Sequence, residues 1–139
     1  KRDDATAEAI RDGWFHTGDL AQIDDEGFVS IVGRLKDMII SGGENVYAAE
    51  VEAVVRELDA VADAALVGRP DAKWGEVGWI VVLPERGQSV DEASVLEHCR
   101  SKLAKYKVPK RVVLRDDLPY SPYGKVDKKA LGAWLDAQG

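Results

Sequence analysis

The sequence is poor in cysteine and histidine and contains no long apolar run. Its single cysteine, Cys99, cannot form an internal disulfide, which agrees with a reducing compartment. The two histidines, His16 and His98, form no Cys/His cluster with metal-ligand spacing. No stretch approaches the ~18 apolar residues of a membrane-spanning helix, and the opening KRDDATAEAI lacks the apolar core of a secretory signal. These absences exclude a disulfide framework and a Cys/His metal centre, predict no transmembrane segment, and favour a cytoplasmic protein.

Two familiar nucleotide-binding signatures are also missing. The chain contains neither the GxxxxGK[ST] phosphate loop nor the GxGxxG dinucleotide motif. Both histidines are expected to be structural or exposed, and Cys99, within the helical pattern VLEHCRSKL, to be a packing residue. The tryptophans are expected mainly in the core. Trp74 is the exception, because AKWGE is typical of a loop between strands.

Charge is distributed unevenly along the 139 residues. Residues 100–139 hold ten Lys or Arg against four Asp, a net charge of +6, whereas residues 1–99 hold nine basic against 21 acidic residues, a net charge of −12. Because the acidic part would repel a nucleic-acid backbone, we expect no nucleic-acid partner. A basic end suits a compact polyanion such as a nucleotide, although a solvated basic face would explain it equally well.

Periodic patterns predict helices and strands interspersed along the chain. The strand predictions are a hairpin on either side of DDEG within residues 14–35, a short strand at 37–40, two longer strands at 60–70 and 75–85, and an extended segment at 106–119. The helix predictions are 4–11, 48–58, 91–103 and 127–137, the last two capped by Asp91 and Asp127. The segment SGGENV, residues 41–46, is predicted to be a glycine-rich loop. Val51, Val54, Val55 and Leu58 are expected on one face of the second helix, and the apolar positions of the third helix include Ala93, Leu96 and Leu103.

These elements predict an α+β fold class. Residues 36–139 should form a small domain with a short β-sheet and flanking helices. A helix and a two-stranded hairpin at residues 1–35 are too little to bury a core by themselves. They are therefore expected to be the tail of a large N-terminal domain that is missing from this chain.

Four short segments contain candidate functional residues: HTGD, GRLKDMI, SGGENVYAAEVE and YSPYGKVDKK. Asp19 follows Gly18 at a strand start, where its carboxylate could accept two hydroxyl hydrogen bonds, such as those of a ribose, or satisfy local backbone. Arg34 could hold the same sugar or a phosphate, or form a salt bridge within the hairpin. Gly42 and Gly43 would let a ligand approach the backbone closely, although a Gly-Gly pair alone is weak evidence for a site.

The order and spacing of these segments resemble the adenylate-forming superfamily. That superfamily comprises acyl-CoA synthetases, the adenylation domains of nonribosomal peptide synthetases, and beetle luciferases. The two stretches that carry the resemblance are GWFHTGDLAQIDDEGFVSIVGRLKDMIISGGENVYAAEVE and LPYSPYGKVDKKAL, and the similarity covers nearly all of residues 13–131. It implies a C-terminal domain of roughly a hundred residues joined to the end of a large N-terminal adenylation domain.

For adenylation, the resemblance implies a role for each motif residue. Asp19 and Arg34 would hold the ribose of ATP and of the acyl-adenylate. Lys36, two residues after that arginine, would be the hinge about which the C-terminal domain rotates; many relatives have Asp there and some have Lys. Lys125 would bridge the substrate carboxylate and the α-phosphate, where a positive charge lowers the barrier between two anions. Lys128 and Lys129 are expected to be solvated helix charges.

For thioester formation, the resemblance implies a second set of residues that contacts CoA. Gly42 and Gly43 would line the pantetheine tunnel, and Trp74 would contact CoA near its adenine end. Tyr106 would stack on the nucleotide and Lys110 would bind a phosphate, with Lys105 and Lys107 as weaker phosphate candidates. Val108 stands where some relatives carry a basic residue.

The predicted function is therefore the C-terminal part of an acid-thiol ligase, an AMP-forming acyl-CoA synthetase. Its substrates and cofactors would be a carboxylic acid, ATP with Mg²⁺ and CoA, with the metal held mainly by the missing domain. Two alternatives stay open: an adenylation enzyme that loads a carrier protein, and a non-catalytic nucleotide- or CoA-binding module. Because the acyl pocket belongs to the missing domain, this chain alone should be inactive and does not define the acid.

Overall fold

The computed structural model describes residues 3–138 of the chain, and side chains from Thr6 onward. Its elements, in chain order, are α1 (Asp3–Ala9), β1 (Ile10–Arg11), β2 (Trp14–Phe15), β3 (Asp19–Ile23), β4 (Val29–Arg34), the 3-10 turn η1 (Leu35–Asp37), β5 (Met38–Ser41), β6 (Glu44–Tyr47), α2 (Ala48–Arg56), β7 (Val61–Asp71), β8 (Gly75–Pro84), α3 (Glu92–Lys102), the 3-10 turn η2 (Lys105–Lys107), β9 (Arg111–Leu114) and α4 (Lys128–Ala137). The α+β fold class predicted from the sequence is confirmed. Within the described part of the chain, no helix has the length and apolar composition needed to cross a membrane.

A five-stranded sheet, β5 to β9, organises the larger part of the molecule. β7 and β8 pair in antiparallel register along nearly their whole length, from Val61 opposite Pro84 to Asp71 opposite Gly75. On its other edge β8 pairs in parallel with β9 and, at Gly75, with Ser41 of β5. β6 closes the sheet as the antiparallel neighbour of β5.

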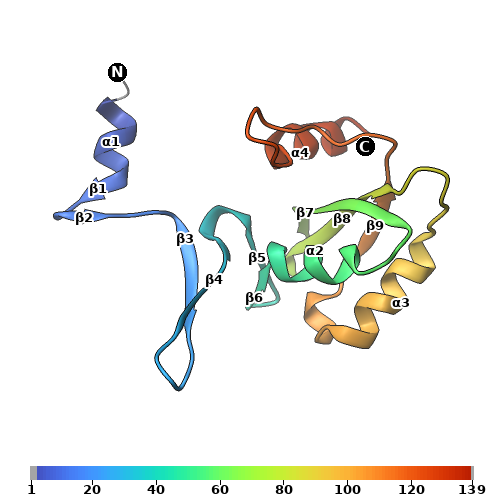
Figure 1. Ribbon diagram of the computed structural model, residues 1–139, viewed down its shortest axis with the longest axis horizontal. Coiled ribbons are helices and arrows are strands. Elements are labelled where there is room, and N and C mark those ends of the chain that lie inside the picture. The colour runs from blue at the N-terminus through green and yellow to red at the C-terminus, as the bar shows by residue number, and fades with distance from the viewer. Residues whose placement is uncertain (1–2, 139) are drawn as a thin grey trace.

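Helices cover both faces of this sheet (Figure 1). The strands alternate their side chains between the two faces, as the period of two requires. On one face Leu66 and Ile80 pack with Val51 of α2 and Val95 of α3, and on the other Val81 packs with α4. This second cluster consists of Leu131 and Leu135 of α4 together with Ala65, Val81 and Leu118. Burial of each such Val or Leu contributes on the order of 1.5–3 kcal/mol, so the two apolar clusters hold the three layers together.

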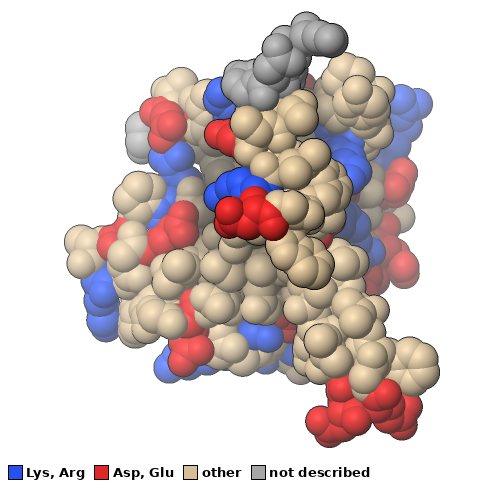
Figure 2. All heavy atoms as spheres, turned by 90° about the vertical axis from the view of Figure 1, so that its left-hand side faces the viewer, with Lys and Arg blue, Asp and Glu red and all other residues tan. Residues whose placement is uncertain are grey.

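Residues 3–34 lie beside this layered unit (Figure 1). The predicted hairpin is confirmed: β3 and β4 pair in antiparallel register from Asp19 opposite Arg34 to Ile23 opposite Val29. In the turn, Asp24 Oδ1 accepts hydrogen bonds from the Glu26 and Phe28 amides at 3.0 and 2.9 Å. Figure 2 shows acidic side chains gathered at the outer end of this projecting hairpin. The hairpin exposes the large apolar side chains of Ile23, Phe28, Val29 and Ile31, and Trp14 of β2 is also exposed.

Several sequence predictions of local structure need correction. The first helix ends at Ala9, since Ile10 and Arg11 pair with β2 instead. The segment SGGENV is not all loop, because Gly42 and Gly43 form a tight turn and β6 begins at Glu44. The segment at 106–119 is not extended throughout, because Tyr106 and Lys107 belong to the turn η2 and only Arg111–Leu114 form strand β9. Trp14 was expected in the core but is 76% exposed.

Both predicted helix caps are confirmed. Asp91 Oδ1 accepts from the Ser94 amide at 2.8 Å, and Asp127 Oδ1 from the Ala130 amide at 3.0 Å. In α3, Val95 and Cys99 are fully buried, and Leu96 and Leu103, which follows the helix, pack against the same cluster, whereas Ala93 is exposed. The predicted face of α2 is correct, and Cys99 is a packing residue as expected.

Candidate functional site

Asp19 and Arg34 lie opposite each other at the open end of the β3–β4 hairpin. The Arg34 Nε atom lies 2.8 Å from Asp19 Oδ1, and the two side chains remain 49% and 28% exposed. The entry to β3 is fixed by Gly18, whose φ of +74° favours glycine and whose carbonyl accepts from the Leu35 amide at 2.8 Å. The salt bridge that the sequence allowed is therefore present, and both groups stay accessible to a ligand.

Lys125 lies at the tip of a loop that is closed by its own backbone. The Ser121 amide donates to the Lys125 carbonyl at 2.7 Å, and the Gly124 amide donates to the Ser121 carbonyl at 2.9 Å. Gly124 has a φ of +76°, a backbone conformation that would be strained for any residue with a side chain. The Asp127 amide donates to the Pro119 carbonyl, so the loop leads directly into the capped start of α4. This backbone framework holds the Lys125 side chain in an exposed position.

The structure brings these three residues together. Asp19, Arg34 and Lys125 line one open pocket of about 400 Å³, which lies between the hairpin and the start of α2. The pocket adjoins a larger groove of about 910 Å³, which shares Arg34 and Lys125 and also contains Lys36 in its lining. Residues that are about a hundred positions apart in the sequence thus face the same space.

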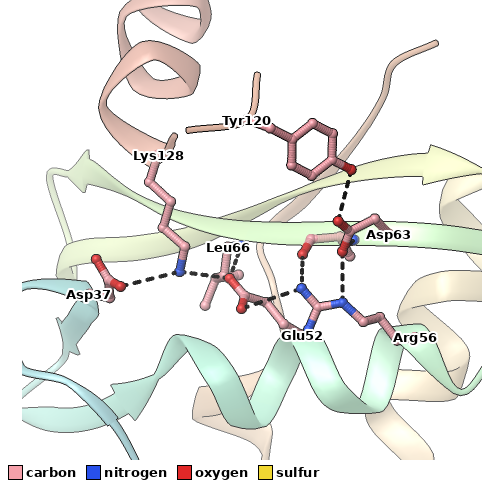
Figure 3. A network of polar contacts seen from close by, with 8 residues as sticks. Asp37, Glu52, Arg56, Asp63, Leu66, Tyr120 and Lys128 are labelled. Carbon is pink, nitrogen blue, oxygen red and sulfur yellow. Dashed lines mark hydrogen bonds and ion pairs between the residues drawn. The ribbon is translucent and has the colours of Figure 1, made fainter. Parts of the chain in front are cut away.

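A buried carboxylate at the base of this pocket has its own cation. Glu52 of α2 is 7% exposed, and its Oε1 atom lies 2.7 Å from Lys128 Nζ and accepts from the Leu66 amide at 2.8 Å (Figure 3). Lys128 Nζ also lies 3.9 Å from Asp37 Oδ2. The expectation that Lys128 is a solvated helix charge is therefore wrong, because its ammonium is paired with Glu52 of α2. Lys129 is exposed, as expected.

The ion pairs leave one cation of the pocket free. Its cationic lining residues are Arg34, Lys125 and Lys128. Arg34 is paired with Asp19 and Lys128 with Glu52, whereas the Lys125 ammonium makes no hydrogen bond or ion pair with any side chain among residues 6–138. A free ammonium beside a pocket is suited to bind an anion from solution.

Lys36 occupies the connection between the hairpin and the sheet. It lies in η1, one 3-10 turn between the end of β4 and the start of β5, and its side chain is exposed. Beyond this turn, β4 also packs against α2 and β6. The connection between β4 and β5 is thus a single turn of backbone.

Gly42, Gly43, Trp74 and Lys110 form a second group away from the pocket. The Gly42 amide donates to the Trp74 carbonyl at 2.8 Å, and both glycines have positive φ values, +61° and +87°. The Lys73 ammonium lies 4.7 Å from the centre of the Trp74 ring, which is 43% exposed. The Lys110 amide donates to Gly78 of β8, next to this same turn region. None of the four residues lines the pocket that contains Lys125.

Asp71 supports the turn that carries Trp74. Its Oδ1 atom accepts from the Trp74 and Lys73 amides, each at 2.9 Å. These two hydrogen bonds lower the pKa of the Asp71 carboxyl, and the nearby charges of Lys110 and Lys73 lower it further. The turn that carries Trp74 is thus held by an ionised carboxylate.

Tyr106 and the lysines around it lie on η2, which packs against β6. Tyr106 is 42% exposed, and the Lys107 ammonium lies 5.8 Å from its ring centre. Lys107 Nζ donates to both carboxylate oxygens of Glu50, at 2.8 and 2.9 Å, which raises the pKa of Lys107. Because its charge is already paired within the protein, Lys107 is a poor phosphate ligand.

Sequence reasoning missed Glu52, although a signal was present. Glu52 lies beside Val51 and Val55 on α2, and a carboxylate next to a buried helix face requires a partner. The sequence alone gave no indication that this partner was Lys128. Among residues 6–138 there is no group of three or more His, Cys, Asp or Glu side chains arranged to hold a metal ion.

Comparison with known proteins identifies the family. Residues 50–125 match the model of the AMP-binding enzyme C-terminal domain, which is more than half of the chain. The chain belongs to this family. Its curated relatives include the long-chain-fatty-acid–CoA ligase FadD13 of Mycobacterium tuberculosis, 47% identical over 130 residues that cover 94% of this chain and 26% of the relative. A feruloyl-CoA synthase of Amycolatopsis sp is 51% identical over 127 residues, covering 91% of this chain and 26% of the relative.

Solved structures agree with this family. The chain superposes with a TM-score of 0.85 on ATP-bound MatB from Rhodopseudomonas palustris, at 40% identity, covering 100% of this chain and 28% of that chain. On apo MatB the TM-score is 0.76, at 41% identity and with the same coverage. The family predicted from the motif order is confirmed, and the chain spans about a quarter of the length of the relatives it matches.

Proposed function

We propose that this chain is the C-terminal part of a cytoplasmic, ATP-dependent acyl-CoA ligase. The observation that carries the proposal is the shared pocket of Asp19, Arg34 and Lys125, in which Lys125 is the cation without a carboxylate partner among the described residues. The relatives FadD13 and feruloyl-CoA synthase are named as CoA-forming enzymes, which favours CoA as the acceptor.

In the first half-reaction, a substrate carboxylate oxygen attacks the α-phosphorus of ATP. The new bond forms as the bond to pyrophosphate breaks, giving acyl-AMP and pyrophosphate. Asp19 would accept hydrogen bonds from the ribose hydroxyls, and Arg34, fixed by Asp19, would hold the nucleotide beside it. The Lys125 ammonium would contact both the carboxylate and the α-phosphate, so that it stabilises the charge that concentrates between them.

In the second half-reaction, the CoA sulfur attacks the acyl carbon, the thiol proton is lost and AMP departs. Rotation about Lys36 would remove Lys125 and bring the Gly42–Gly43 turn to the acyl-adenylate. Trp74 and Tyr106 would then contact the nucleotide part of CoA, and Lys110 a phosphate. The separation of Gly42, Gly43 and Trp74 from the Lys125 pocket supports the assignment of the two groups of residues to different half-reactions. The higher TM-score against ATP-bound than against apo MatB supports an adenylation-like arrangement here.

We also propose that residues 1–35 are the end of a large N-terminal domain and that residues 36–139 are the mobile domain. The exposed apolar side chains of the hairpin would pack against that larger domain, because a surface this apolar rarely stays in water. Magnesium would be bound with ATP mainly by the larger domain, since residues 6–138 contain no cluster of three or more His, Cys, Asp or Glu side chains that could hold a metal ion.

The test uses the full-length ligase with Lys125→Ala. Carboxylate-dependent exchange of labelled pyrophosphate into ATP should be abolished, whereas thioester formation from supplied acyl-AMP and CoA should be retained. Lys129→Ala, an exposed neighbour, is the matched control and should leave both rates unchanged. Equal loss of both half-reactions in Lys125→Ala would refute the assignment of Lys125.

Two further measurements address the alternatives. The isolated 139 residues should release no pyrophosphate, and measurable release would contradict the need for a larger domain. Wild-type enzyme should form thioester with free CoA. Thioester formed only on a phosphopantetheinylated carrier protein would instead establish the carrier-loading alternative.

A further inference from the structure

Glu52 presents a negative charge to the same pocket as the free Lys125. Its carboxylate is nearly buried, and three groups approach it: the Leu66 amide at 2.8 Å, Lys128 Nζ at 2.7 Å and Arg56 Nη2 at 3.8 Å. A buried carboxylate needs a cation close by, because burial removes the water that would otherwise solvate it.

Arg56 is not available as the main partner of Glu52. Its Nε atom lies 2.8 Å from Asp63 Oδ1, and its Nη2 donates to the Ala64 carbonyl at 2.7 Å (Figure 3). The contact of Arg56 with Glu52 is the longest of its polar contacts. Lys128 is therefore the cation that neutralises Glu52.

Lys125 is a second lysine at the same pocket as Glu52. It lies three residues before Lys128, it lines the same pocket as Glu52, and its ammonium has no carboxylate partner among residues 6–138. A lysine side chain has a flexible four-carbon stem, so it can reach toward a neighbouring charge. Two lysines thus border one buried carboxylate, and only Lys128 is bonded to it.

We propose that Lys128 is a positioning residue. By forming the ion pair with the Glu52 carboxylate, it keeps the Lys125 ammonium free to bind the reacting anions. This inference rests on the proposed function of Lys125. Without Lys128, the unpaired Glu52 carboxylate attracts Lys125 into the protein and withdraws it from the substrate. The contact of Lys128 with Asp37, beside the hinge residue Lys36, orients the lysine across the same pocket.

The experiment is a double-mutant cycle in the full-length ligase, with Lys128→Met, Glu52→Gln and the two combined. A glutamine at position 52 keeps an oxygen for the Leu66 amide but removes the charge that would attract Lys125. Adenylation is measured as carboxylate-dependent pyrophosphate exchange, and thioester formation is measured from supplied acyl-AMP and CoA. Thermal unfolding is recorded for every variant, and Lys129→Met is the matched control.

Lys128→Met should slow adenylation by about tenfold or more, the scale expected when a reacting group is misplaced, and should leave thioester formation from acyl-AMP within about twofold. Lys128→Arg should keep adenylation near the wild-type rate. The combined variant should recover to within about threefold of Glu52→Gln alone, because the competing charge is gone. If Lys128→Met acted only through lost packing, removing the Glu52 charge as well would not restore the adenylation rate, so recovery in the combined variant distinguishes the two explanations.

Three outcomes would overturn the inference: unchanged adenylation in Lys128→Met, equal loss of both half-reactions, or a combined variant as slow as Lys128→Met. If Lys128→Met does not fold, the combined variant decides, since it contains no unpaired buried charge; adenylation tenfold slower than in Glu52→Gln would then refute the idea. The proposed function fails separately, if Lys125→Ala leaves adenylation intact.

Discussion

Gly42 lies directly against the indole ring of Trp74. A β-carbon placed on Gly42 would fall 2.7 Å from Trp74 Cε3 and 3.1 Å from Cζ3, and the Gly42 φ of +61° already favours glycine. The glycine turn between β5 and β6 and the aromatic of the β7–β8 turn are therefore one packed unit. Two segments that the resemblance assigns to CoA binding are held together by this contact.

Gly42→Ala should destabilise the chain by about 2–3 kcal/mol, because the added methyl meets Trp74 and the backbone is strained at positive φ. Gly43→Ala is the matched control. Its φ of +87° imposes a similar backbone strain, but its β-carbon would meet nothing within 4 Å, so a cost of about 1 kcal/mol is expected. Urea unfolding of the 139-residue chain measures both. Equal costs would show that the Trp74 contact contributes nothing.

Asp63 should make the chain sensitive to acid. Burial alone would raise its pKa, but hydrogen bonds from Arg56, the Ala64 amide and Tyr120 outweigh burial and lower it below the ordinary value of 3.8. A depressed folded pKa stabilises the fold above the unfolded value and loses that contribution as pH falls through the folded pKa. Stability should therefore fall below about pH 4, the window in which Asp63 becomes protonated.

Asp63→Asn isolates this contribution. The variant should be less stable than wild type near neutral pH by about 1–3 kcal/mol, since Arg56 and Tyr120 lose a charged acceptor. It should lose less stability than wild type between about pH 5 and pH 2.5. Urea unfolding across this range is the measurement, with Asp25→Asn in the exposed hairpin turn as control. Parallel pH profiles for wild type and Asp63→Asn would contradict the assignment.

Cys99 should be unreactive in the folded chain. Its side chain is fully buried, and this burial raises the pKa of the thiol, opposed only by the charge of Arg100. A disulfide reagent at neutral pH should therefore label the native chain very slowly and the urea-unfolded chain at once. Rapid stoichiometric labelling without urea would show that α3 opens readily.

Leu131 should be a main anchor of α4. It is 0% exposed in the cluster between α4 and the sheet, so Leu131→Ala should cost about 2–5 kcal/mol of unfolding free energy. Leu114 of β9 is 45% exposed, and Leu114→Ala should cost less than about 1 kcal/mol. The midpoints of urea unfolding measure the loss of stability in Leu131→Ala and in Leu114→Ala. A similar small cost for both would mean that α4 is held mainly by its polar contacts.

The local pattern predicted the longer elements well and the short ones poorly. β7 and β8 contain the short continuous apolar stretches AALV and WIVVL, and α2 repeats its apolar residues at helical spacing, so each had a clear signal. β6 follows two glycines and has four residues, which is too short for a pattern to show. In α3, the apolar composition did not show which residues would be buried, and packing against the sheet buries Val95 and Cys99 fully and Leu96 in part while Ala93 stays exposed.

The candidate site was predictable only in part, for a related reason. The motif order indicated Asp19, Arg34 and Lys125 because each of them lies in a short motif of consecutive residues that resembles the family. The ion pairs of Lys107 with Glu50 and of Lys128 with Glu52 could not be predicted from the local sequence. Each pair joins side chains from distant segments, so it exists only after the sheet and its helices have packed.

The sequence by itself determined the α+β class, the family, the capped helices and the identity of the lysine loop, because these depend on residues close together in the chain. The tertiary structure decided which charges are free and which are paired. Lys125 and Lys128 are the same kind of residue, three positions apart, and nothing local distinguishes them. Only the packing of α2 and α4 on opposite faces of the sheet lets Lys128 reach Glu52 and leaves Lys125 facing the pocket.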